Sequence, residues 1–242
     1  DIAFGSVRLP LEALLSDNPI YHEIIFNFRL PKALTAVITG ASISVAGLLM
    51  QTLFRNPLAG PYVLGVSSGA SLGVAIFLLG SSFLPMHFIQ SGWGLVISAI
   101  LGGVFVLLLV LGISFHVRQA VSLLIVGIMF GQIAGSLVTI LQNSSNPDSL
   151  KLFVVWTFGS LSAVSWTYMQ VMLPLVAIGL VLALTIQKSL NGLLLGENYA
   201  QGLGINIVRT RFLIIIAVTL LAGTTTAFTG PIAFIGMAVP HL

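Results

Sequence analysis

The residues that could do chemistry are few, and the first is a serine flanked by glycines. Gly65-Val66-Ser67-Ser68-Gly69 matches G-x-S-x-G, the strand-to-helix turn that presents a nucleophilic serine in many hydrolases. That chemistry needs a preceding strand and a nearby histidine and acid, whereas this segment has a helical pattern. Glycines at four-residue spacing explain the match as helix packing, so we expect no catalytic residue.

The sequence predicts no metal or cofactor site either. Its four histidines are far apart, and none forms the H-E-x-x-H pattern of a zinc helix. The chain has no cysteine, which removes thiolate ligands, disulfides and a cysteine nucleophile.

Composition explains why reactive side chains are so scarce. Of the 242 residues, 57% are hydrophobic and 6% are charged, whereas about 25% are charged in a soluble domain. The nine Lys and Arg residues are spread along the chain and form no patch for nucleic acid. We therefore expect an all-α, polytopic integral membrane bundle that forms a single domain, residues 1–242.

Six apolar segments are long enough to cross the roughly 30 Å hydrocarbon core of a bilayer. None contains Asp, Glu, Lys or Arg. The predicted spans are residues 33–54, 63–84, 93–115, 121–141, 166–186 and 212–228.

Charges in the connections predict the topology, because cytoplasmic loops are enriched in Lys and Arg. One side has only Lys151 beyond the N-terminal segment. The other, predicted cytoplasmic, side has five basic residues: Arg55, Arg118, Lys188, Arg209 and Arg211. Residues 1–30 would then lie outside. A chain that starts outside with Asp1 and stops as a new apolar segment begins is expected to be a fragment of a longer protein, cut at both ends.

Small residues predict how the spans pack, since helices in lipid associate through close backbone approach. Gly65, Gly69 and Gly73 repeat at four-residue spacing in the second span, and Gly127, Gly131 and Gly135 do so in the fourth. We expect the first, second and fourth spans to form the tight centre of the bundle. The third span, apolar over residues 104–110, is expected to face lipid.

Polar side chains inside a span are costly and are functional candidates. Gln132 lies in the middle of the fourth span, with Ser136 and Thr139 on roughly the same face. Two interpretations stay open: these side chains form hydrogen bonds between helices, or Gln132 lines a water-filled path.

The cytoplasmic connection 188–211 is apolar for a loop, and Gly202 and Gly204 would divide it into two short helices. It could lie on the membrane surface or dock into a groove of a partner protein.

Several motifs together resemble the permease subunits of ABC importers for iron–siderophores, haem and vitamin B12, the FecCD/BtuC-like family. The resemblance covers essentially the whole chain, and its most specific part is Asn-Pro-Leu-Ala followed by Leu-Gly-Val-Ser. In order, the motifs are residues 29–32 (Arg-Leu-Pro-Lys), 47–51 (Gly-Leu-Leu-Met-Gln), 56–59 (Asn-Pro-Leu-Ala), 64–70 (Leu-Gly-Val-Ser-Ser-Gly-Ala), 195–204 (Leu-Gly-Glu, Ala200 and Leu-Gly) and 230–241 (Gly-Pro-Ile-Ala-Phe-Ile-Gly through Pro-His).

The resemblance implies a partial type II ABC importer permease fold, the family's second to seventh helices and the start of the eighth, in the bacterial inner membrane. It also implies no enzymatic activity and no cofactor in this chain, because ATP and Mg²⁺ are bound by a partner ATPase. The other implied partners are a periplasmic or lipoprotein substrate-binding protein and a second permease copy, identical or related.

Residue roles follow from the resemblance in the same way. Arg29 and Lys32 would meet the binding protein on the outside. The stretch expected at the cytoplasmic gate is Gln119, Ala120, Val121 and Ser122. The positions expected to dock on the ATPase are Leu195, Gly196, Glu197, Ala200, Leu203 and Gly204.

The expected substrate is an iron chelate, a siderophore complex or haem, moved by alternating access. Cobalamin or an oxyanion such as molybdate is the alternative, although the gate stretch is hydroxyl-rich in the vitamin B12 member and carries only Ser122 here. An ion-coupled secondary transporter is a second alternative, and the lack of acids in the spans weighs against it.

Overall fold

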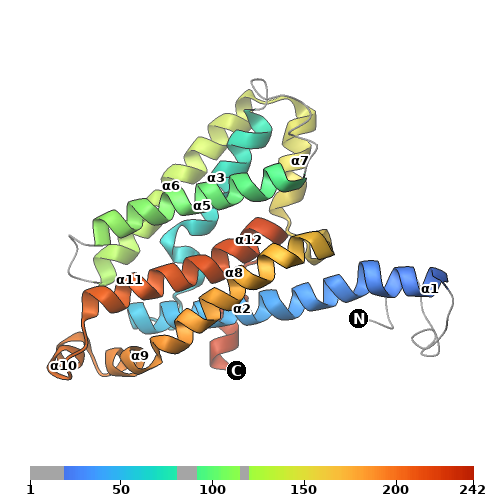
Figure 1. Ribbon diagram of the computed structural model, residues 1–242. Coiled ribbons are helices and arrows are strands. Elements are labelled where there is room, and N and C mark those ends of the chain that lie inside the picture. Colours follow the sequence, from blue (N-terminus) through green and yellow to red (C-terminus); the bar gives the residue numbers. More distant parts are fainter. Residues whose placement is uncertain (1–18, 81–91, 115–119) are drawn as a thin grey trace.

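The fold was analysed in a computed structural model, which describes residues 19–80, 92–114 and 120–242. Every regular element in these ranges is helical. Figure 1 shows two groups of long helices, one with α3, α5 and α6 and the other with α2, α8 and α11–α12. Their bounds are α2 Leu30–Phe54, α3 Val66–Leu79, α5 Gly92–Ser114, α6 Ala120–Ser144, α8 Trp166–Thr185, α11 Ile207–Val218 and α12 Thr224–Thr229, with a π-helical turn η6 at Thr219–Gly223.

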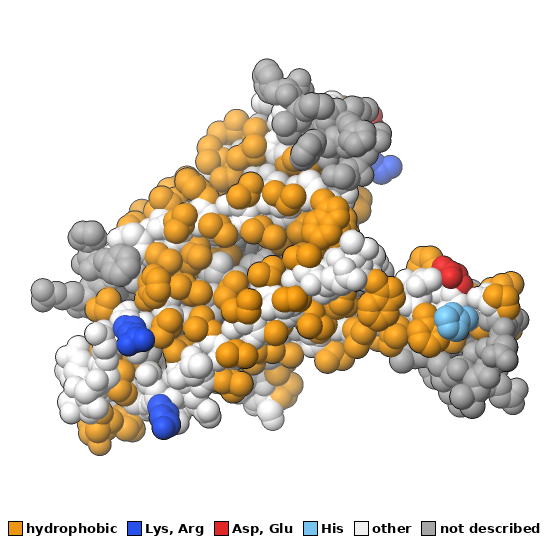
Figure 2. All heavy atoms as spheres, in the orientation of Figure 1, with side chains coloured by type: hydrophobic (Ala, Val, Ile, Leu, Met, Phe, Trp, Pro, Cys, Tyr) orange, Lys and Arg blue, Asp and Glu red, His pale blue; other side chains and the backbone are white. Residues whose placement is uncertain are grey.

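Five of these helices are long and apolar enough to cross a membrane: Pro19–Phe54, Gly92–Ser114, Val121–Ser144, Trp166–Thr185 and Ile207–Thr229. The predicted span 63–84 contains a 3₁₀ turn, η3 (Pro61–Leu64), and the 14-residue helix α3; residues 81–84 lie outside the described ranges. Apolar side chains cover the middle of the molecule in Figure 2, and charged atoms are visible toward its ends.

The first span is longer than the sequence suggested. Helix α1 (Pro19–Glu23) and the π-helical η2 (Ile24–Arg29) run into α2 and make one 36-residue helix, about 54 Å long at 1.5 Å per residue. The expected external segment is therefore helical from Pro19 onward, and residues 1–18 lie outside the described ranges. The indole Nε1 of Trp166, at the start of α8, donates to the carbonyl oxygen of Phe26 in η2 at 2.8 Å, a backbone acceptor of the kind that π-turns release.

The centre of the bundle is the span formed by α11, η6 and α12. In its most apolar stretch 72% of the residues are buried, against 22% for α6. Its threonines keep their hydroxyls satisfied locally: Thr219 donates to Ile215 O at 2.9 Å and Thr229 to Thr225 O at 2.8 Å.

Helices α3 and α5 make a close contact, whereas the sequence placed the third span toward lipid. A methyl group on Gly73 would overlap the carbonyl oxygen of Ser98, and one on Gly102 would overlap that of Gly69. The lipid-facing prediction for α5 is thus correct only in part, because one face carries this contact while Phe105, on another face, is exposed.

The glycines of α6 differ from one another. A Cβ on Gly127 would lie 2.5 Å from Val63 O, and one on Gly131 would lie 3.3 Å from Ser68 Oγ. Apart from the backbone of its own helix and its two chain neighbours, no atom of the described residues lies within 4 Å of a Cβ built on Gly135. The expectation that α6 belongs to the tight centre is therefore wrong for its second half.

Four further short elements lie outside the predicted spans. Helix α7 (Pro147–Thr157) begins at Asn146, whose side chain accepts from Ser149 N at 2.8 Å, and the 3₁₀ turn η5 (Leu161–Ala163) follows it. At the end of the chain, α13 (Ile235–Ala238) and η7 (Val239–His241) fold back on α2, where a methyl group on Gly47 would overlap the Gly236 carbonyl.

Candidate functional site

The connection between α8 and α11 is a pair of short helices, α9 (Gln187–Leu194) and α10 (Glu197–Gly202). The joint between them is Gly196, whose φ of 113° is rarely adopted by a residue with a side chain. Gly204, at φ 82°, turns the chain from α10 toward α11. The sequence predicted two short helices with the break at Gly202 and Gly204, and the structure has the break at Gly196 instead.

The apolar side chains of this pair divide into two sets. Leu193 and Ala200 are buried and hold the pair to the bundle. Leu195 and Leu203 are 64% and 59% exposed, and Leu194 and Tyr199 are similarly exposed. Exposed large apolar side chains grouped at one end of a bundle are typical of a surface that binds another protein.

Glu197 does not face outward as expected. Its Oε1 lies 2.5 Å from the guanidinium Nη2 of Arg211, whose side chain is 5% exposed against 32% for that of Glu197. The pair joins the first residue of α10 to the span α11. We therefore assign Glu197 a contact within the chain.

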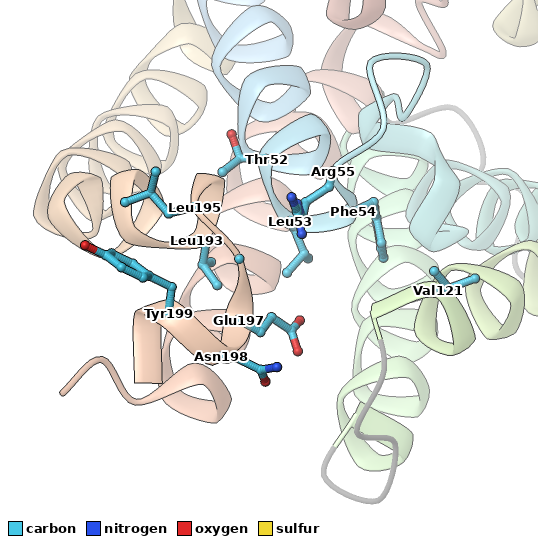
Figure 3. A pocket seen from close by; sticks show the side chains of 11 residues that line it. Thr52, Leu53, Phe54, Arg55, Val121, Leu193, Leu195, Glu197, Asn198 and Tyr199 are labelled. Atoms are coloured by element: carbon cyan, nitrogen blue, oxygen red, sulfur yellow. The ribbon is translucent and has the colours of Figure 1, made fainter. Parts of the chain in front are cut away.

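A groove of about 740 Å³ lies between α9–α10, the C-terminal end of α2 and the N-terminal end of α6. Figure 3 shows Arg55, Glu197 and Tyr199 around it, with Val121 across from α10. The lining residues are Thr52, Leu53, Phe54, Arg55, Val121, Leu193, Leu195, Gly196, Glu197, Asn198 and Tyr199.

The turn after α2 forms one wall of this groove. Arg55 ends the helix in the left-handed conformation, with φ 48°, and the amide of Leu58 donates to Asn56 Oδ1 at 2.9 Å. Asparagine side chains stabilise such turns by replacing a backbone acceptor. The Asn-Pro-Leu-Ala motif is therefore a rigid turn beside α9 and α10.

The predicted gate stretch is described in part. Gln119 lies outside the described residues, and Ala120 begins α6. Val121 is exposed and lines the groove, while Ser122 is half-buried. The groove therefore lies between the predicted docking helices and the predicted gate.

Gln132 lies in the middle of α6 on an exposed face. Ser136 Oγ donates to the carbonyl oxygen of Gln132, and Thr139 Oγ1 to that of Gly135, both at 3.0 Å. These two hydroxyls are satisfied within the helix. The polar face of α6 stays uncovered by the rest of the described chain.

Arg29 and Lys32 lie at the other end of the bundle from α9 and α10, where η2 meets α2. Both are half-buried, and residues three apart share one side of a helix. Among the described residues no group of three or more His, Cys, Asp or Glu side chains could hold a metal ion.

Sequence reasoning missed Arg211 as a buried residue and counted it as a loop charge. A signal was present, because Arg211 has helical spacing with Ile207 and Ile215, which are both buried. The exposed side chains of Leu194 and Tyr199 were missed as well.

Comparisons with known proteins agree with this architecture. The model of the FecCD transport family matches residues 1–242. The chain is 33% identical over 241 residues to the hemin transport system permease protein HmuU of Yersinia pestis, covering 98% of this chain and 72% of the relative. It is 39% identical over 227 residues to the vitamin B12 import system permease protein BtuC of Vibrio cholerae, covering 93% and 66%.

A third relative is the Fe(3+) dicitrate transport system permease protein FecD of Escherichia coli, 34% identical with 98% and 73% covered. The chain thus spans between 66% and 73% of the length of these three proteins. A solved structure of a metal-chelate type ABC transporter in an inward-facing conformation superposes with a TM-score of 0.88 at 29% identity, over 99% of this chain and 74% of the other. This multi-spanning membrane protein belongs to the FecCD transport family.

Proposed function

We propose that the chain is part of the membrane permease subunit of an ABC importer that carries iron chelates, siderophore complexes or haem, across the bacterial inner membrane. Its named relatives are permeases for hemin, ferric dicitrate and vitamin B12. The matched structure is of a metal-chelate type transporter.

The observation that carries the proposal is the α9–α10 surface. Its exposed leucines and tyrosine stand on helices anchored by buried side chains and by the Glu197–Arg211 pair. A short apolar helix pair of this kind suits the groove of a partner protein. The proposed partner is the ATPase, which binds ATP and Mg²⁺.

Two other partners complete the proposed transporter. A second permease copy, identical or related, would cover the polar face of α6 around Gln132 and enclose the pathway there. A substrate-binding protein would meet Arg29 and Lys32 at the opposite end. Charged pairs between two proteins fix how the partners are aligned more than they add affinity.

In the proposed mechanism, ATP binding moves the docked α9–α10 pair and the bundle alternates between outward and inward access. The glycine contacts of α3 with α5 support motion as rigid bodies, because closely packed helices do not deform continuously. The binding protein selects the substrate.

Co-purification tests the docking surface in the full-length permease co-expressed with the ATPase encoded beside it. Leu203→Lys should reduce recovery of the ATPase by about tenfold or more, because a charge replaces one of the exposed apolar side chains of the proposed contact. The matched control is Leu152→Lys in α7, also exposed but at the other end of the bundle. Equal recovery with both variants would contradict the docking role.

The substrate class is tested with the purified binding protein encoded in the same operon. We expect it to bind a ferric siderophore or haemin in a titration followed by tryptophan fluorescence. Binding of cobalamin or molybdate alone would contradict the iron-chelate assignment and leave the permease assignment in place.

A further inference from the structure

The Glu197–Arg211 pair is the link between the docking helices and the most buried span of the molecule. Glu197 is the first residue of α10, and Arg211 lies in the second turn of α11. The two side chains meet at 2.5 Å, and the arginine is almost completely buried. The charge of Arg211 is therefore buried inside the bundle, and the carboxylate of Glu197 pairs with it there.

The backbone turns sharply on either side of α10. Gly196 precedes the helix at φ 113° and Gly204 follows it at φ 82°. Both backbone conformations favour glycine, which has no Cβ. Between these two points, α10 is held by the buried methyl group of Ala200 and by the ion pair.

A buried ion pair resists separation, because removing one partner leaves an uncompensated charge in a low-dielectric interior. Movement of α10 that kept the pair intact would therefore have to move α11 with it. The span that begins with α11 continues through η6 and α12 to Thr229, whose carbonyl oxygen accepts from Ser160 N at 2.6 Å. It thus connects the docking end of the bundle to the loop at the other end.

We propose that Glu197 and Arg211 are positioning residues that transmit movement of the ATPase-docked α10 to the span α11–α12. The inference rests on the proposed function, because it requires an ATPase on α9–α10. It differs from the docking role first expected for Glu197, since the carboxylate acts on α11 and not on the partner.

The test uses the full-length permease with its ATPase in lipid nanodiscs and measures ATP hydrolysis with and without the cognate binding protein. Glu197→Gln keeps the shape of the side chain and removes its charge. We expect the ATPase to co-purify at the parent level, while stimulation of hydrolysis by the binding protein falls about tenfold, the size of one charge-assisted hydrogen bond. The double variant Glu197→Arg, Arg211→Glu restores the ion pair with its charges exchanged, and it should recover most of the stimulation.

Arg209→Gln is the matched control, because Arg209 lies two residues before Arg211 in α11 and is exposed, so its loss should leave stimulation unchanged. Thermal unfolding of each variant separates positioning from folding. Full stimulation in Glu197→Gln overturns the inference alone. Joint loss of ATPase binding and thermal stability, without recovery in the exchange, also overturns it. If no ATPase co-purifies even with the parent permease, both the inference and the proposed function fail.

Discussion

Two spans of similar length and hydropathy, α6 and α11–α12, occupy opposite kinds of position in this molecule. The most apolar stretch of α11–α12 is 72% buried and that of α6 is 22% buried. Both carry hydroxyl side chains that donate to carbonyls of their own helix, Thr225 in α12 and Thr139 in α6. Thr225 is fully buried and Thr139 is exposed.

The difference shows that hydropathy identifies a span but not its neighbours. In lipid, an apolar surface gains nothing by leaving the hydrocarbon, so the apolar content of a helix does not say whether protein or lipid surrounds it. An exposed polar face such as that of α6 is different, because lipid does not solvate it well. We infer that α6 is completed by contacts beyond the described residues.

The largest effect is expected from a charge placed at equivalent hydroxyl positions of the two helices. Thr225→Asp should destabilise the protein by about 3 kcal/mol or more, because the carboxylate would be buried without a partner. Thr139→Asp should cost far less, since its position faces a polar surface. Thermal unfolding in detergent of the two variants tests this, and an equal loss in both would break the contrast.

A smaller loss of stability is expected for substitutions in α6, and it should differ between the two halves of the helix. Gly127→Leu should cost about 1 to 3 kcal/mol, because its side chain would meet the backbone of Val63 and Leu64. Gly135→Leu should leave the unfolding temperature of the isolated permease almost unchanged. If the Gly135 variant unfolded as early as the Gly127 variant, α6 would be packed along its whole length.

The smallest effect on stability is expected at Gln132. Gln132→Leu should change the free energy of unfolding by less than about 0.5 kcal/mol, as an exposed position does. Uptake of radiolabelled iron chelate into proteoliposomes should nevertheless fall if Gln132 lines the pathway. Unchanged uptake would favour a role in hydrogen bonding between helices.

Much of this fold was accessible from the sequence. The predicted span 166–186 differs by one residue from α8, and the predicted span 93–115 starts one residue after the start of α5 and ends at residue 115, outside the described ranges. Charge-free apolar stretches give such bounds because the hydrocarbon sets their length. Helix α7 was missed because it has 11 residues, too few for that criterion.

Contacts between helices were harder to predict. The glycine ladder of α3 was recognised, but its partner was sought in α6, since the third span has its small residues at one end and leucines at the other. The ion pair of Glu197 was not predicted for a similar reason: the sequence shows a charge in a loop and does not show the buried arginine that pairs with it. Buried ion pairs are tertiary features, and neither residue alone predicts them.

The long first helix has one more consequence. From Pro19 to Phe54 it is continuous, and at about 54 Å it exceeds the roughly 30 Å of hydrocarbon by a wide margin. Arg29, toward one end of this helix, and Arg55, the residue that follows its other end, are therefore connected by a continuous helix. In the proposed transporter, tilting this helix by about 5° would shift one end relative to the other by roughly 5 Å, so a protein bound at the Arg29 end would move the groove wall at Arg55.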